Sequence, residues 1–171
     1  SPAQVLGVTF VDKDGSLNIV GGSLTGIADQ VVVSNIVTSR GTLTFTGNST
    51  GGNGSSGQAV IGHIGESGKA ISAMNVGGAS TNNHANVTID GDVFANSVNL
   101  RNDNIGNTFD SHLTMSSGRH LTGTVTTDVN GMGDLTLSGG TQTVTGTVGA
   151  NSMSLDTVTS GANDATSTFT G

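Results

Sequence analysis

The sequence contains no cysteine, no tryptophan and no tyrosine, and it has a single proline. Without cysteine, the fold can use neither disulfide bonds nor a cysteine-ligated zinc ion. The lack of tryptophan removes the core residue that is typical of an immunoglobulin-type sandwich. With only five phenylalanines, large aromatic rings cannot dominate a core. We therefore expect a core made of thin, stacked layers of aliphatic side chains.

Basic residues are also scarce. Five Lys and Arg residues stand against 12 Asp and Glu residues, which gives a net charge of −7 and a pI near 4.6. This balance argues against a nucleic-acid partner, because such partners require a basic surface. No apolar run approaches the ~20 residues of a membrane helix, and no signal-peptide pattern opens the chain. We expect no membrane insertion by this segment, and an export signal that was removed or lies upstream if the protein is secreted.

What is abundant points to strands. Gly, Thr, Ser and Asn make up just over half of the chain, and all four disfavour helices. Between them, Val, Ile, Leu, Met and Phe alternate with Thr and Asn, which is the pattern of half-buried strands. The length of 171 residues fits one domain with a buried core. We predict a single all-β domain that spans residues 1–171.

A strand that is centred on Thr and followed by Gly recurs along the chain, at Thr44, Thr88, Thr114 and Thr136. The last two steps measure 26 and 22 residues, and the first step of 44 looks like two periods or one period with an insertion. Units of this size cannot bury their apolar face alone, so they stack. The sequence therefore predicts a right-handed parallel β-helix of about 5 to 7 coils, with the apolar neighbours of each Thr pointing inward.

A second repeat relates residues 91–100 to residues 146–155, which share a Gly-x-Val-x-Ala-Asn-Ser pattern. The rhythm breaks in a Gly/Ser-rich insertion at about 48–58 and, more mildly, at 77–84. Solenoids place variable, partner-contacting surface in such loops, although a solvated spacer has the same composition. Both interpretations of the two loops stay open.

Few residues have the spacing of a metal site. Asp12 and Asp14 resemble the start of a calcium loop, but the position that needs a bidentate acid is Ser23. Calcium there and an ordinary turn both remain possible. The segment 131–135 has only one copy of a calcium-binding nonapeptide pattern, and such sites need stacked copies. The four histidines have no ligand spacing: His63, His84, His112 and His120.

Catalytic patterns are missing as well. The Ser55 and Ser56 run is low-complexity loop rather than a nucleophile elbow. Carboxylates that successive coils could bring together, as in glycan-cleaving β-helices, are Asp90, Asp92, Asp103 and Asp110. The chain is nevertheless poor in the basic and aromatic residues that hold sugars. We predict no catalytic, cofactor-binding or metal-ligating residue, no cofactor and no enzymatic activity.

Several segments together resemble a known family. They are residues 41–48, 61–65 and 74–78, with the Gly-x-Val-x-Ala-Asn-Ser pair. From about residue 19 onward, the chain resembles the passenger domains of autotransporters, and most of all the rickettsial surface antigen group (surface cell antigen and outer-membrane protein A/B type). This resemblance implies a β-helical passenger that is exported through a C-terminal barrel to the outer surface of a Gram-negative bacterium.

The resemblance also implies a function. We expect a non-catalytic structural or adhesive segment whose partners are host-cell or matrix surface molecules. The alternative is a subunit of a surface layer or extracellular filament, in which strand edges or coil ends pair with copies of the same chain. A glycan-active β-helix enzyme is the third and least favoured interpretation.

Overall fold

The computed structural model describes residues 7–12, 15–47, 57–79, 83–102, 110–161 and 165–171. Every named element in these ranges is a β-strand. All of the strand pairs are parallel, and they form two sheets. None of the described residues belongs to a helix that could cross a membrane.

The larger sheet has ten strands. One row of hydrogen-bonded neighbours runs β1-β4-β7-β10-β12-β14-β16, and β2, β5 and β8 join it in the order β2-β5-β8-β10. The bounds of its strands are Val8–Phe10 (β1), Ser16–Val20 (β2), Val31–Asn35 (β4), Arg40–Thr46 (β5), His63–Ile64 (β7), Ile71–Val76 (β8), Val93–Leu100 (β10), Leu121–Thr127 (β12), Thr141–Thr145 (β14) and Thr166–Thr170 (β16).

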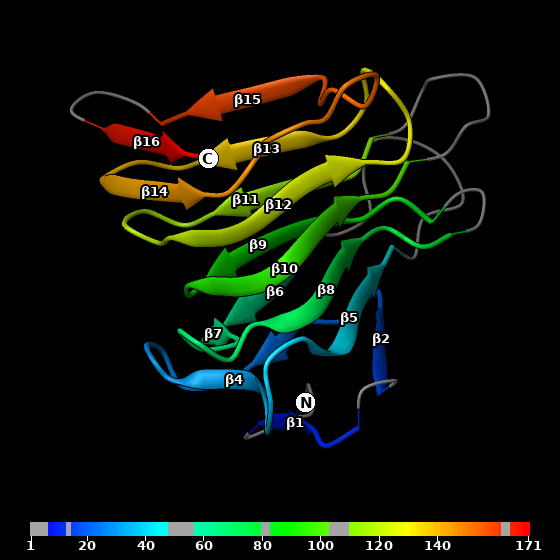
Figure 1. Ribbon diagram of the computed structural model, residues 1–171, viewed down its shortest axis with the longest axis vertical. Helices are drawn as coiled ribbons and strands as arrows, with labels where there is room; N and C mark the ends of the chain where they lie inside the picture. Colours follow the sequence, from blue (N-terminus) through cyan, green and yellow to red (C-terminus); the bar gives the residue numbers. More distant parts are fainter. Residues whose placement is uncertain (1–6, 13–14, 48–56, 80–82, 103–109, 162–164) are drawn as a thin grey trace.

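The smaller sheet has six strands in the order β15-β13-β11-β9-β6-β3. Their bounds are Leu24–Thr25 (β3), Gln58–Ile61 (β6), Asn86–Asp90 (β9), His112–Met115 (β11), Asp134–Leu137 (β13) and Thr157–Ser160 (β15). The chain passes from one sheet to the other and back, so that each coil lies on the previous one (Figure 1). The predicted parallel β-helix is confirmed, with about 5 turns.

The core lies between the two sheets and is aliphatic, as the composition predicts. Its side chains form rows along the stack; in the smaller sheet, Val87 pairs with Leu113, and Leu113 with Leu135. All three are fully buried. The predicted inward direction of the residues beside each Thr is confirmed, because the following side chains are also fully or almost fully buried: Leu43, Phe45, Ile89, Met115 and Leu137.

The register explains the irregular Thr spacing. Thr88, Thr114 and Thr136 are consecutive partners in the smaller sheet, and the next partner is Thr159. Thr44 instead lies on β5 in the larger sheet, opposite Asn75. The first interval is therefore neither two periods nor one with an insertion. This interval separates two strands that look alike in sequence but lie on different sheets. Strands of both sheets have the same alternating pattern of apolar and polar residues.

The second sequence repeat does not become a structural repeat. Val93 pairs with Leu121, and Leu121 with Val144, whereas Val148 forms a bridge with Val125. Residues 146–155 thus lie several positions out of step with β10, and they close a turn by the antiparallel bridge of Ala150 and Met153. The Gly/Ser-rich run at 48–56 lies outside the described residues.

One glycine shows how tightly the coils stack. Gly123 on β12 has a φ of 148°, and a Cβ atom there would lie 2.1 Å from the Ala95 carbonyl oxygen of β10. It sits where the pairing of β10 with β12 shifts register between Phe94 and Ser97. Only glycine allows the two backbones to come this close.

Both ends of the described stack leave inward-facing rows partly uncovered. At one end, Val158 on β15 and Phe169 on β16 are 43% and 47% exposed, although their partners Leu135 and Val144 are fully buried. At the other end, Leu17 and Ile19 on β2 are only partly buried above Leu43 and Phe45. Both end faces of the described stack therefore expose apolar side chains, and their outer strands have no further partner strand among the described residues.

Candidate functional site

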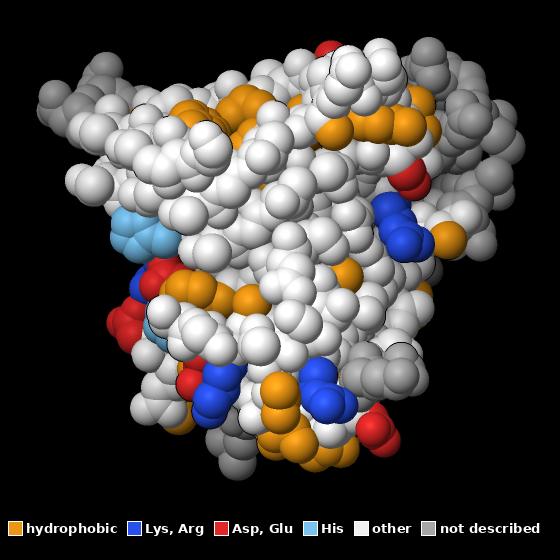
Figure 2. All heavy atoms as spheres, viewed as in Figure 1, with side chains coloured by type: hydrophobic (Ala, Val, Ile, Leu, Met, Phe, Trp, Pro, Cys, Tyr) orange, Lys and Arg blue, Asp and Glu red, His pale blue; other side chains and the backbone are white. Residues whose placement is uncertain are grey.

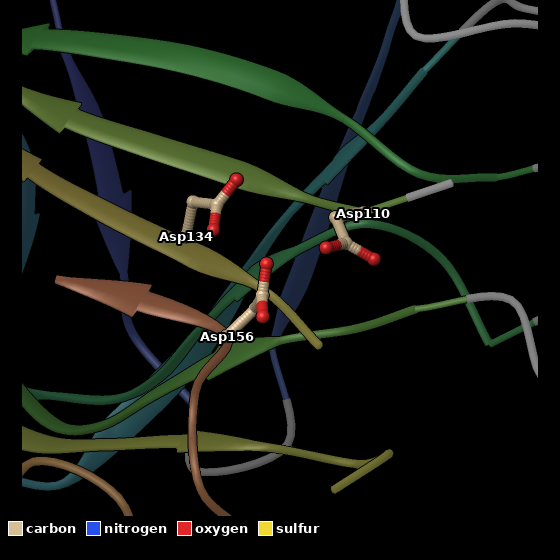
Figure 3. A group of neighbouring side chains, drawn as sticks. All are labelled: Asp110, Asp134 and Asp156. Carbon is tan, nitrogen blue, oxygen red and sulfur yellow. The ribbon is translucent and has the colours of Figure 1, made fainter. Parts of the chain in front are cut away.

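Three carboxylates form a column where the chain enters successive strands of the smaller sheet. Asp110 precedes β11, Asp134 is the first residue of β13, and Asp156 precedes β15. The three side chains turn toward a common point (Figure 3). One oxygen of each lies within 4.8 Å of the others. We call this group the acidic column.

Two features of the acidic column set its electrostatics. Burial raises the pKa of Asp110 above its ordinary value, and the neighbouring Asp134 carboxylate raises it further. Across the column, His112 Nδ1 lies 2.7 Å from Asp134 Oδ2. The other Asp134 oxygen is buried without a hydrogen-bond partner among the described residues. The column therefore concentrates negative charge beside one imidazole.

The donor set of the column suits a hard cation only in part. Carboxylate oxygens are the ligands that Ca²⁺ prefers, but Ca²⁺ takes six to eight of them. The column offers one oxygen from each of three residues, and one residue already contacts His112. Clustered acids also occur without a metal, so the absence of a metal site stays a prediction.

A second charged group ties distant coils together. Arg119, which precedes β12, contacts the Asp29 carboxylate between β3 and β4, and its Nη2 lies 2.9 Å from Asp90 Oδ1 at the end of β9. The Arg119 guanidinium holds the pKa of Asp29 below its ordinary value, through a hydrogen bond and through its charge. The contact joins residues that are 90 positions apart. We call this group the arginine clamp.

Two histidines beside the clamp hold neighbouring coils through backbone groups. The amide N–H of Asp92 donates to His63 Nδ1 at 2.7 Å, and that of Thr143 donates to His120 Nδ1 at 3.0 Å. The Asp92 carboxylate in turn accepts from the His120 amide at 2.8 Å. These side chains therefore tie neighbouring coils together at the corner of the solenoid.

A groove of about 300 Å³ opens where β10 and β12 end. It is lined by Asn99, Arg101, Thr126, Thr127 and Asp128. We call it the Arg101 groove. Asn99 and Thr126 belong to a row of polar side chains on the outer surface of the larger sheet. This surface faces the viewer in Figure 2, where uncoloured polar and backbone atoms dominate and basic atoms are few.

The row of polar side chains is hydrogen-bonded from coil to coil. Thr126 donates to Asn99 at 2.9 Å, Asn99 to Asn75 at 2.8 Å, and Asn75 to Thr44 at 3.1 Å. The four residues are register partners on β12, β10, β8 and β5. We call them the Asn/Thr ladder. Because each side chain is fixed by its neighbour, the ladder presents its remaining polar atoms in fixed positions.

The carboxylates that the sequence suggested do not form one cluster. Asp90 and Asp92 lie near Arg119 and His63, whereas Asp110 lies at the entry to the strands of the smaller sheet. Asp90 ends β9 and Asp110 precedes β11, so they stand at opposite ends of paired strands. The following residues, weighed as carboxylate, calcium or nucleophile candidates, lie outside the described ranges: Asp14, Asp103, Ser55 and Ser56.

The acidic column and the Arg101 groove were not predicted from the sequence. An Asp at the entry to a Thr-centred strand, either its first residue or one or two residues before it, is the signal that could have found the column. It required the strands at 112–115, 134–137 and 157–160 to be placed on the same sheet. No comparable signal marks the groove, since Arg101 and Asp128 become neighbours only through the register of β10 and β12.

Comparison with protein families, curated proteins and solved structures finds no match to this chain. The fold itself defines the class, which is the parallel β-solenoids.

Proposed function

We propose that this chain is a non-catalytic segment of a bacterial cell-surface protein that presents a rigid, polar β-helical surface for adhesion to host-cell or matrix molecules. The observation that carries the proposal is the Asn/Thr ladder. Its side chains are bonded to one another across four strands, and three of the four are only partly buried. A fixed array of amide and hydroxyl groups binds polar partners with little loss of side-chain entropy. Export to the surface of a Gram-negative bacterium is supported by the sequence resemblance.

Adhesion is tested by coating beads with the purified chain and measuring binding to epithelial cells and to matrix proteins. We expect saturable binding that falls in the Asn99→Ala/Thr126→Ala variant. The matched control is Thr114→Ala/Thr136→Ala, which removes outward Thr side chains from the smaller sheet. Absence of saturable binding by the intact chain would contradict the proposal. Equal loss in both variants would remove the ladder as the contact surface.

The Gly/Ser-rich run is the other candidate contact segment to test. Deleting residues 51–57 should change stability by ~1 kcal/mol or less, because loop-closure entropy depends only weakly on length. If the ladder is the contact surface, adhesion by this variant should equal that of the intact chain. A selective loss of adhesion would place the contact in the loop instead.

A self-assembling surface-layer or filament subunit is the second candidate, and the apolar end faces favour it. Val158 and Phe169 are exposed at one end, and the outer edges of β15 and β16 have no partner strand among the described residues. Free parallel edges of this kind pair readily with another strand. Size-exclusion chromatography and negative-stain imaging test this candidate. Fibres that disappear in Val158→Lys/Phe169→Lys would support it, and a monomer at high concentration would exclude it.

A further inference from the structure

The Arg101 groove begins with the register of two strands. Asn99 and Leu100 on β10 lie opposite Thr126 and Thr127 on β12. Arg101 and Asp128 directly follow these pairs, so a cation and an anion leave the sheet at the same edge and line one groove. The strand ends that form this edge lie together on the right of Figure 1.

Asn102 fixes the wall of the groove. Its side-chain amide donates to the Leu100 carbonyl and to Thr127 Oγ1, both at 2.8 Å. Its backbone N–H donates to Asp128 Oδ1, also at 2.8 Å. This hydrogen bond orients the Asp128 carboxylate, and no described residue donates a hydrogen bond to its Oδ2. A site whose polar groups are already fixed binds a ligand with less ordering cost.

The Arg101 guanidinium lacks the partners that Arg119 has. Arg101 is partly buried, yet no described residue forms an ion pair or a side-chain hydrogen bond with its guanidinium. A guanidinium carries five N–H donors in a planar fork that matches a carboxylate. In a chain with five basic residues and a net charge of −7, a partly buried arginine beside a groove, with no ion-pair partner among the described residues, points to an anionic ligand.

The other groove residues restrict which anion fits. The Asp128 carboxylate accepts hydrogen bonds, so the ligand must carry donors such as hydroxyl groups. Its negative charge disfavours a multiply charged anion such as phosphate. Asn99 and Thr126 use part of their capacity within the ladder and keep further polar sites. A single carboxylate surrounded by hydroxyl groups satisfies all of these residues, and that is the chemistry of an acidic sugar.

We propose that the Arg101 groove binds an acidic saccharide, with the sugar carboxylate on Arg101 and sugar hydroxyls on Asp128 and the Asn99–Thr126 pair. Its volume of about 300 Å³ is at the lower end of the range for small-molecule sites and fits one sugar unit. The saccharide site rests on the proposed function for its role at the cell surface. It names the kind of polar surface molecule, a glycan, that the chain would bind there.

The test is a titration of the intact chain followed by backbone amide NMR. Glucuronate should shift the amides around residues 99–102 and 126–128 and saturate with a Kd on the order of 1 mM. Glucose and acetate should each bind at least tenfold more weakly, because one lacks the carboxylate and the other the hydroxyls. Inorganic phosphate should also bind at least tenfold more weakly.

Variants separate the roles of the two charged residues. Arg101→Gln should weaken glucuronate binding at least tenfold, whereas Arg40→Gln, a matched change on β5 away from the groove, should leave it unchanged. Asp128→Asn should weaken glucuronate binding without weakening acetate binding. No saturable shift with glucuronate, equal binding of phosphate, or an unchanged Arg101→Gln variant would overturn the proposal.

The titration and the bead adhesion assay fail independently. Saturable adhesion without glucuronate binding would overturn the saccharide groove and leave the proposed function standing. Glucuronate binding without adhesion to any cell or matrix surface would overturn the proposed adhesive function and leave the saccharide groove standing. Variants that still show the dispersed amide spectrum of the intact chain exclude misfolding as the cause of either result.

Discussion

His112 and Asp134 are register partners on adjacent coils, and His112 Nδ1 lies 2.7 Å from Asp134 Oδ2. Within the acidic column, the His112 imidazole contacts Asp134. Asp110 and Asp156 approach Asp134 from the two neighbouring coils. The column is therefore a place where like charges stack along the solenoid. Its consequences for stability follow from the sign of the pKa shift of Asp110.

The Asp110→Asn variant should be slightly more stable than the natural chain at pH 7. The pKa of Asp110 is raised from its ordinary value of 3.8, so its charged form is disfavoured in the folded state. That penalty is fully present above the raised pKa and is relieved as the pH falls toward 3.8. Because the side chain is partly exposed, screening limits the gain to ~0.5 kcal/mol. Urea unfolding at pH 7 and pH 4 measures it, and a gain that grows at pH 4 would contradict the assignment.

Removing divalent cations should leave the fold unchanged. The aliphatic core and the backbone ladders hold the coils, and the acidic column supplies too few ligands for tight Ca²⁺ binding. We expect the same melting temperature in 1 mM EDTA and in 1 mM CaCl₂. A rise of several degrees with calcium, about what 1–2 kcal/mol gives a domain of this size, would reveal a site. Loss of that rise in Asp134→Asn would place the site in the column.

Two adjacent substitutions test the direction of the side chains on β13. Leu135→Asp buries an unpaired charge in the core and should cost several kcal/mol, because Leu135 is fully buried. Thr136→Asp changes an outward, partly exposed residue and should cost less than about 1 kcal/mol. Circular dichroism melts of both variants make the comparison. Similar losses would mean that the strand is out of register.

The arginine clamp should contribute to stability in a pH-dependent way. Arg119 lowers the pKa of Asp29, so the stabilisation is present above the ordinary value of 3.8 and is lost as the pH falls through the lowered value. Arg119→Gln should therefore melt at a lower temperature than the natural chain at pH 7, with a difference that shrinks at pH 3. Arg40→Gln is the matched control and should show no such trend. A pH-independent difference would mean that Arg119 acts through packing alone.

Local pattern was sufficient to predict the fold class but not which sheet each strand joins. Alternation alone identified the inward residues around Thr44 and Thr88, because a strand buries every second side chain whichever sheet it enters. The assignment of Thr44 to the other sheet depends on the length of the intervening turns, which the pattern does not encode. Interruptions in the repeat therefore could not be distinguished from changes of sheet.

Polar contacts between residues far apart in the chain also could not be predicted from the sequence. Gln142 is fully buried, accepts from the Gly139 amide at 2.8 Å, and donates to the Ser116 carbonyl at 3.0 Å and the Arg119 carbonyl at 3.1 Å. A lone Gln in a Thr-rich segment looks like a surface residue until the turn that it fills is known. The same holds for Arg101 and Asp128, which are 27 positions apart and meet only through strand register.

The exposed side chains of Val158 and Phe169 mark the part of the solenoid that should unfold locally most often. In a solenoid each coil is held only by the coils directly beside it, so stability passes from neighbour to neighbour. Among the described coils, the coil formed by β15 and β16 pairs with one neighbour, whereas the coil containing β9 and β10 pairs with two. Amide hydrogens in β15 and β16 will therefore exchange with solvent through shallow local openings, and protection will rise toward β9 and β10. Proteases that cut transiently open chains will therefore digest the purified 171-residue chain from the β15–β16 coil first.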